Sequence, residues 1–308
     1  MENPSVRDQN EMLTHEGVTV VIPCFNRANS IGSAVESVLS QTHSNWIALV
    51  VDDGSVDDTR QVVQSYCRKD SRIRLLKNHR GKGAQGARNT GIEAANTAWV
   101  AFLDSDDRYL APSLEMRLKC AADTGMDVVH SPCLTLNSSG KGLMPIEIPP
   151  LRGNIYRDLL IMPGPMFQGL LVRKGAMEQI GLLDESLVSY QEWDTSIRLA
   201  KHFPFAFLAE PTFSYVINSA DAISQNKLRS AIGYEHILKK HFAEILDEMG
   251  ATAIAHHYRI LARLYWNAGQ NQKAFRYLLA AVARSPLTFF YTNRYTSHAH
   301  WNSPGSAS

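Results

Sequence analysis

The sequence has little cysteine and no excess of charge of either sign. Its four cysteines, Cys24, Cys67, Cys120 and Cys133, include no C-x-x-C pair. This argues against a zinc site or a disulfide framework and fits a reducing compartment. The formal net charge of +1 predicts no nucleic-acid partner, so any phosphate recognition must be local.

Long apolar runs are also missing. The lead up to Glu16 is polar and lacks the apolar core of a signal peptide, and no run approaches the roughly 18 residues of a membrane span. These absences predict a cytoplasmic protein. The chain has 308 residues, of which 44% are hydrophobic, so it can bury a large core.

Short apolar runs alternate with helical patterns through the first part of the chain. The runs begin near residues 18, 46, 73, 98 and 127, and the first ends at Pro23. Such alternation is typical of an α/β fold with a doubly wound, mostly parallel sheet. In the final third, helical spacing on both sides of Gly269 predicts a C-terminal α-helical extension with one tetratricopeptide-like hairpin.

The patterns along the chain predict an order of domains. We expect a disordered lead over 1–16, a domain over 17–220, a helical extension over 221–290 and a tail over 291–308. Residues 137–153 are rich in Asn, Ser, Gly and Pro, which predicts a long loop. This loop follows the boundary between two halves of the domain, 17–131 and 132–220.

The sharpest contrast in the chain is a buried strand that ends in acid. The apolar run Ala98 to Leu103 is followed at once by Asp104, Asp106 and Asp107. Ligands of open α/β sheets bind outside the carboxyl ends of the strands, where side chains at i and i+2 face the same way. Asp104 and Asp106 are therefore candidates to share one Mg²⁺ or Mn²⁺ with substrate phosphates. A solvated Asp-rich turn is the alternative interpretation.

A glycine-rich segment, Gly81-Lys-Gly-Ala-Gln-Gly86, has the G-x-G-x-x-G pattern of dinucleotide-binding proteins. It follows the third predicted strand, whereas that fingerprint belongs to the first βα turn. The acidic residues downstream also form a cluster, whereas recognition of a ribose needs only one carboxylate. These features disfavour a nicotinamide or flavin site, and the absence of G-K-[ST] excludes a P-loop.

Five segments stand out between residues 17 and 220: Val20-Val-Ile-Pro-Cys-Phe-Asn-Arg27, Val51-Asp-Asp-Gly-Ser-Val-Asp-Asp-Thr59, Gly86-Ala-Arg-Asn-Thr-Gly91, Phe102-Leu-Asp-Ser-Asp-Asp107 and Gln191-Glu-Trp-Asp194. In their order and approximate spacing they resemble the family 2 glycosyltransferases with the GT-A fold. The resemblance implies that a sugar moves from a nucleotide-diphosphate donor, with UDP the expected nucleotide, to an acceptor hydroxyl with inversion. It also implies a divalent metal, Mn²⁺ or Mg²⁺, on the diphosphate. The acceptor is expected to be a glycan or a lipid-linked sugar.

The resemblance assigns roles to individual residues. The expected nucleotide-binding residues are Pro23, Phe25, Asn26, Arg27, Asp53, Arg88, Asp104 and Ser105. Asp106 is the expected metal ligand, together with Asp104. A nucleobase needs an acceptor for its ring N–H and an apolar wall, which Asp53, Pro23 and Phe25 could supply. Asp107 is expected to be a cap or a turn residue for the helix that starts near Pro112. Lys82 is interpreted as an exposed charge.

Removal of the acceptor's proton requires a carboxylate. Tyr190-Gln-Glu-Trp-Asp194 opens a predicted helix, and the dipole at its N-terminus favours an ionised Glu192. By its position in the family motif, Glu192 is the expected catalytic base, and Asp194 is the alternative base. Many family members carry Glu-Asp where this chain has Gln191-Glu192. Trp193 is expected to lie in the core.

Two other functions stay open from the sequence. One is a non-catalytic nucleotide-sugar-binding scaffold, and the other is a sugar-nucleotide pyrophosphorylase, disfavoured because its glycine-rich first loop is missing. The helical extension could bind a protein partner or a second copy of the chain. The aromatic segment Phe289 to Tyr295 could contact the inner membrane face, but packing on the preceding helices is the favoured interpretation.

Overall fold

The computed structural model describes residues 16–136, 143–145, 148–216 and 226–285. They form two compact units. Unit 1 comprises Met1–Ile155, Pro165–Glu185 and Arg198–Ile217, and unit 2 comprises Tyr156–Gly164, Ser186–Ile197 and Asn218–Ser308. Most of the lead expected over 1–16, the tail over 291–308 and the aromatic segment near residue 290 lie outside the described residues. The domain limits expected from composition stay a prediction.

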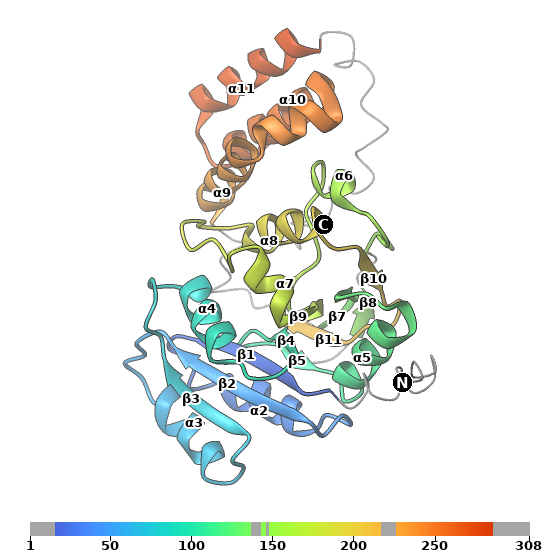
Figure 1. Cartoon of the computed structure of the whole chain (residues 1–308). Helices are drawn as coiled ribbons and strands as arrows, with labels where there is room; N and C mark the ends of the chain where they lie inside the picture. The colour runs from blue at the N-terminus through green and yellow to red at the C-terminus, as the bar shows by residue number, and fades with distance from the viewer. Residues whose placement is uncertain (1–15, 137–142, 146–147, 217–225, 286–308) are drawn as a thin grey trace, which may run out of the picture. The chain divides into compact units, whose positions relative to one another are not determined.

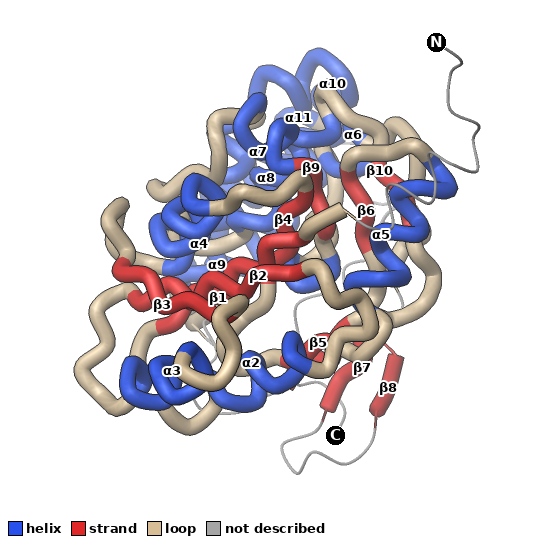
Figure 2. The backbone as a smooth tube through the Cα atoms, turned by 60° about the horizontal axis from the view of Figure 1, so that its bottom comes forward, coloured by secondary structure: helices blue, strands red, loops and turns tan. Residues whose placement is uncertain are grey.

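Unit 1 is built on a sheet that is mostly parallel, as the sequence predicts (Figures 1 and 2). Within the described residues its strands, in spatial order, are β10 (Phe205–Phe207), β6 (Val128–His130), β9 (Leu171–Arg173), β4 (Trp99–Phe102), β1 (Val18–Cys24), β2 (Trp46–Asp52) and β3 (Ile73–Lys77). Among these seven described strands, only β9 runs antiparallel to its neighbours. The first strand extends one residue past Pro23, which is buried inside it.

Helices cover both faces of this sheet, so its central strands are buried throughout. Figure 2 shows α2 (Ile31–Leu39) and α3 (Thr59–Cys67) on one face and α4 (Ala84–Ala94) on the other. The remaining helical elements of unit 1 are α5 (Ser113–Thr124), the 3₁₀ helix η1 (Phe167–Gly169) and α7 (Lys174–Gln179). In α2, Ile31, Ala34, Val35 and Val38 form one apolar stripe packed into the core.

The prediction of a long loop over 137–153 is partly wrong, because a strand of a second, smaller sheet lies within this range. Its strands in order are β5 (Arg108–Tyr109), β11 (Phe213–Val216), β7 (Cys133–Leu136) and β8 (Leu143–Pro145). Strand β8 lies inside the predicted loop and pairs antiparallel with β7. β8 forms because β7 supplies its backbone partners. Its three residues are too few to show the alternating pattern by which a strand is predicted from sequence.

Unit 2 is helical. Its elements are α6 (Tyr156–Leu159), the first part of α8 (Gln191–Ala200), α9 (Lys227–Lys240), α10 (Phe242–Asn267) and α11 (Asn271–Arg284). The turn between α10 and α11 contains Gly269 at φ 72°, and these helices confirm the predicted C-terminal helical region. Gly250, at φ 78°, kinks α10, where an L-residue would be strained. No helix in the described part of the chain is long and apolar enough to cross a bilayer.

Candidate functional site

Parallel pairing brings three polar loops to one edge of the sheet in unit 1. Strand β1 pairs with β2, with Cys24 opposite Asp52, and on its other side with β4, with Val21 opposite Phe102. The residues that follow these strands therefore leave the sheet at the same edge. The three motifs predicted around Phe25, Asp53 and Asp104 belong to these loops, in agreement with the rule for ligand sites in open sheets.

Asp104 is held by a buried arginine from α4. Arg88 is 6% exposed, and its Nη2 donates to Asp104 Oδ1 at 2.5 Å, while its Nη1 donates to Gln85 Oε1 at 2.6 Å. The guanidinium lies 4.5 Å from the centre of the Phe167 ring. Arg88 is therefore not an exposed loop charge. Its ion pair fixes the Asp104 carboxylate at the sheet edge.

Gln168, a residue that the sequence analysis missed, connects two of the aspartates. Its Nε2 donates to Asp104 Oδ2 at 2.8 Å and to Asp107 Oδ2 at 2.6 Å. Asp107 is 2% exposed and so is not the solvated turn residue of the alternative interpretation. Its predicted role as a helix cap is also wrong, because α5 begins after Pro112 without a side-chain cap. Asp107 does form the predicted turn, since its backbone N–H donates to the carbonyl oxygen of Asp104.

Asp106 carries a negative charge that the fold leaves poorly balanced. Burial raises the pKa of the Asp106 carboxyl above its ordinary value, the Asp104 carboxylate raises it further, and Arg27 acts in the opposite direction. Ser105 between the two aspartates is buried. No group of three or more His, Cys, Asp or Glu side chains within the described ranges has the geometry to hold a metal. A cation here would need ligands from a substrate, which is the usual arrangement for Mg²⁺.

The loop after β2 presents Asp53 near an exposed aromatic ring. Both Asp53 oxygens accept hydrogen bonds, Oδ1 from Asn78 Nδ2 at 2.6 Å and Oδ2 from the Gly83 N–H at 2.8 Å. Phe25 is 44% exposed, and Lys82 Nζ lies 5.5 Å from the centre of its ring. Of the two residues expected to form an apolar wall, Phe25 is exposed and Pro23 is buried in β1.

Local hydrogen bonds join the loops after β1 and β2. Asn26 adopts φ 52°, a left-handed conformation that Asn tolerates, and its Oδ1 accepts from the Val56 N–H at 2.9 Å. Its own N–H donates to Ser55 Oγ, and the N–H of Arg27 donates to Thr59 Oγ1 at 2.7 Å. The Asp57 carboxylate accepts from the Thr59 N–H at 3.0 Å, although the N-cap residue of α3 is Asp58, which makes no side-chain cap hydrogen bond.

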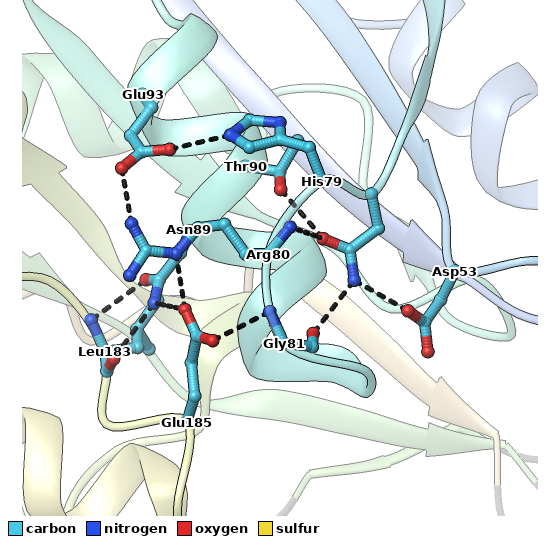
Figure 3. Close-up of polar contacts among 10 residues, drawn as sticks. Asp53, His79, Arg80, Gly81, Asn89, Thr90, Glu93, Leu183 and Glu185 are labelled. Atoms are coloured by element: carbon cyan, nitrogen blue, oxygen red, sulfur yellow. Dashed lines mark hydrogen bonds and ion pairs between the residues drawn. The ribbon is translucent and has the colours of Figure 1, made fainter.

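The glycine-rich segment follows β3 and runs into the start of α4, so it does not form the first βα turn. Hydrogen bonds hold its backbone in place. Figure 3 shows the Glu185 carboxylate accepting from the Gly81 N–H at 3.0 Å, from Arg80 Nε at 2.5 Å and from Asn89 Nδ2 at 2.7 Å. A Cβ on Gly86 would lie 1.8 Å from the Gly81 carbonyl oxygen, which explains the glycine there. Glu185 was not identified from the sequence, because it lies about a hundred residues from its partners and no local motif marks it.

Asn78 connects the glycine-rich segment to Asp53. Its Nδ2 donates to Asp53 Oδ1 and also to the Gly81 carbonyl oxygen at 3.0 Å, while Thr90 Oγ1 donates to Asn78 Oδ1 at 2.9 Å (Figure 3). The Asp53 carboxylate is therefore oriented by groups from the loop after β3 and by α4. An acceptor fixed in this way can recognise a ring N–H with little loss of side-chain entropy.

In unit 2, α8 begins at Gln191 as predicted and carries Glu192 in its first turn. Glu192 is partly exposed, whereas Asp194 is fully buried. Asp194 Oδ1 lies 2.8 Å from Lys240 Nζ and 2.9 Å from His241 Nε2. Trp193 is 1% exposed, which confirms its expected place in the core.

The fold is the GT-A fold of nucleotide-sugar transferases. Staphylococcus aureus TarS residues 1–349 in complex with UDP-GlcNAc align with a TM-score of 0.61 and 15% identity, over 88% of this chain and 92% of that one. The mannosyltransferase PcManGT from Pyrobaculum calidifontis, in complex with GDP-Man and Mn²⁺, aligns with a TM-score of 0.61 and 16% identity, over 87% of this chain and 75% of that one.

Sequence comparison identifies the family. The model of glycosyl transferase family 2 matches residues 19–181, more than half of the chain, and the chain belongs to this family. Over 134 residues it is 39% identical to the Escherichia coli UDP-Glc:alpha-D-GlcNAc-diphosphoundecaprenol beta-1,3-glucosyltransferase WfgD, which covers 42% of this chain and 52% of that protein. The chain spans only 25% and 26% of the length of two matching rickettsial glycosyltransferases.

Proposed function

We propose that the chain is an inverting glycosyltransferase that moves a sugar from a UDP-sugar to a hydroxyl of a lipid-linked or growing glycan. The observation that carries the proposal is the pair of acidic loops after β2 and β4, which parallel pairing with β1 brings to one sheet edge. The family, and the activity named for WfgD, support the reaction class and UDP as the nucleotide.

The nucleotide is assigned to the loops of unit 1. In this proposal Phe25 stacks on the base, and Asp53 accepts the ring N–H of uracil. The ribose and diphosphate are assigned to Asp104, Ser105 and Arg88, although Arg88 acts mainly by holding the Asp104 carboxylate. The backbone around Asn26 and Arg27, which is tied to the loop after β2, completes the nucleotide site.

The residues fit a divalent cation that the donor helps to hold. Asp106 is the main proposed ligand, because the fold leaves its charge poorly balanced. Asp104 is a weaker second ligand, since Arg88 and Gln168 already occupy its oxygens. When bound, Mn²⁺ or Mg²⁺ stabilises the negative charge of the departing diphosphate. The PcManGT structure is a complex with GDP-Man and Mn²⁺, which supports this choice.

Glu192 is the proposed catalytic base. The acceptor O–H bond breaks as its proton passes to the carboxylate, and the oxygen forms a new bond to the anomeric carbon. The bond between that carbon and the diphosphate oxygen breaks on the opposite face, and the electron pair leaves with UDP. We prefer Glu192 to Asp194, because Asp194 is fully buried and paired with Lys240 and His241.

A screen of the purified chain against nucleotide-sugars with Mn²⁺ tests this function. We expect one UDP-sugar to be consumed, slowly by water and faster with a diphospholipid-linked sugar as acceptor, with UDP released. Glu192→Gln should lower the transfer rate by roughly 100-fold or more, while the affinity for UDP stays unchanged. Binding of UDP without any transfer would instead support a scaffold, and consumption of UTP with sugar phosphate would support a pyrophosphorylase.

A further inference from the structure

The first turn of α8 is fixed by two buried neighbours of Glu192. The indole N–H of Trp193 donates to the Leu159 carbonyl oxygen at 2.6 Å, and the ring packs against Tyr234, with centroids 5.1 Å apart. The next residue, Asp194, has no exposed surface. A buried carboxylate is costly unless charged partners compensate it, so its surroundings determine how this turn is held.

One partner of Asp194 is a histidine that lies between two carboxylates. His241 is 3% exposed, its Nε2 lies 2.9 Å from Asp194 Oδ1, and its Nδ1 lies 2.7 Å from Glu244 Oε2. The ring therefore joins Asp194 to Glu244 through its two nitrogens. Lys240 Nζ lies 2.8 Å from the same Asp194 oxygen and places a positive charge beside it.

The segment just before α8 is held by α9 as well. Arg229 Nε donates to the Val188 carbonyl oxygen at 2.8 Å, and Ser189 Oγ donates to the Arg229 carbonyl oxygen at 3.1 Å. The two backbones approach closely, because a Cβ on Gly233 would lie 1.8 Å from Ser189 Oγ. Contacts from α9 therefore hold the chain both before and after the residue proposed as the base.

We infer that His241 is a positioning residue for Glu192. Through its contact with Asp194, the His241 ring fixes the orientation of the first turn of α8, and so the direction in which the Glu192 carboxylate points. The inference rests on the proposed role of Glu192. It makes the C-terminal helices α9 and α10 part of the catalytic apparatus of this chain, in addition to any partner that they bind.

Kinetics of His241→Ala and His241→Gln in the full chain test the inference. We expect kcat for transfer to fall by about 100-fold in His241→Ala, because small displacements of a catalytic group have large effects on rate. The donor KM and the affinity for UDP should change by less than roughly twofold, since the proposed nucleotide contacts belong to unit 1. His241→Gln, which keeps one donor for Asp194, should recover part of kcat. His236→Ala, on the exposed face of α9, is the matched control and should keep the wild-type kcat.

A double-mutant cycle separates positioning from a general loss of structure. Asp194→Asn and His241→Gln act through one contact, so the double variant should lose no more kcat than the worse single variant. Multiplicative losses, or normal kcat in folded His241→Ala, would overturn the inference.

These results are distinguishable from failure of the proposed function. If wild-type protein transfers sugar and Glu192→Gln is inactive while His241 variants are normal, only the positioning role is wrong. If Glu192→Gln transfers sugar at the wild-type rate, the assignment of the base is wrong, and the positioning inference fails with it.

Discussion

Two aspartates separated by one residue have different surroundings and so different proposed roles. Asp104 is neutralised by the buried Arg88 and hydrogen-bonded to Gln168, whereas Asp106 is partly buried near a second negative charge. Because its folded-state pKa is raised, Asp106 favours folding most at low pH, where it is protonated. That contribution is lost as the pH rises through its folded-state pKa, so at neutral pH the ionised carboxylate opposes folding.

Asp106→Asn should therefore have opposite effects with and without ligand. We expect the melting temperature of the ligand-free protein to rise at neutral pH, while the further increase caused by UDP with Mn²⁺ disappears and transfer falls by roughly two to three orders of magnitude. Thermal unfolding with and without UDP and Mn²⁺ measures both effects. Asp123→Asn, at an exposed position on α5, is the control and should retain the ligand effect. A full increase with UDP and Mn²⁺ in Asp106→Asn would contradict Asp106 as a ligand.

Single residues were predictable from sequence where the signal is local. The contrast between the apolar run and the aspartates placed Asp104 and Asp106 after a buried strand, and the helix-start pattern placed Glu192 in a first turn. Their partners were not predictable in this way. Gln168 lies 64 residues from Asp104, and the two meet only because η1 packs against β4. The buried state of Arg88 and Asp194 likewise depends on tertiary packing.

Among the elements, the glycine-rich segment after β3 depends on one close backbone approach. Gly86→Ala would bring a Cβ within 1.8 Å of the Gly81 carbonyl oxygen, so the backbone must shift, and with it the Gly83 N–H that orients Asp53. We expect both a lower melting temperature and an affinity for UDP weakened by roughly tenfold, the equivalent of one lost hydrogen bond. Isothermal titration calorimetry with UDP, together with thermal unfolding, measures the two effects.

Gly175→Ala is the matched control for this substitution. Gly175 lies in α7, and a Cβ there would meet nothing within 4 Å. Alanine in a helix interior is better than glycine by about 0.5–1 kcal/mol, so this variant should be slightly more stable and bind UDP normally. Equal loss of UDP affinity in both variants, or none in Gly86→Ala, would contradict the supporting role of the segment.

The long helices and strands could be predicted from the sequence, whereas the short ones could not. β1, β2 and β4 are buried apolar runs, and α10 and α11 keep their helical spacing over many residues. β8, η1 and β9 each have three residues. Such short elements form because a neighbour supplies the backbone partners, which a local pattern cannot show.

At the scale of the whole molecule, each unit contains a buried neutral histidine. His130 Nε2 lies 2.6 Å from the Leu151 carbonyl oxygen, and His257 contacts Tyr234 and Leu160. Burial lowers the pKa of each histidine from 6.5 to about 4. An unfolded chain binds these protons more readily, so stability is lost as the pH falls from 6.5 toward about 4.

We therefore expect the melting temperature to fall on mild acidification, well before most carboxylates are protonated. Melting curves recorded between about pH 7 and pH 5 test this expectation. His257→Gln can still donate to the Leu160 carbonyl oxygen but cannot titrate, so its melting temperature should depend less on pH. His236→Gln, at an exposed position, should follow the wild type. A flat wild-type profile over this range would show that the buried histidines do not control acid stability.

Each of the two units is made of several separate segments of the chain, so the boundary between the units does not fall at one point in the sequence. The sequence predicted a helical extension after the α/β domain, and α9, α10 and α11 agree with that prediction. It did not show that the start of α8, which carries Glu192, packs with α9 and α10 in the same unit. These contacts join residues about 40 or more positions apart, so no periodic pattern predicts them.

The configuration of the transferred sugar tests the central claim most directly. NMR of the product formed from an α-linked UDP-sugar and a diphospholipid-linked acceptor gives the anomeric configuration from the coupling of the anomeric proton. We predict a β-linked product from the wild-type chain and, in the same incubation time, none from Glu192→Gln. An α-linked product, or equal amounts of product from both proteins, would contradict direct displacement with Glu192 as the base.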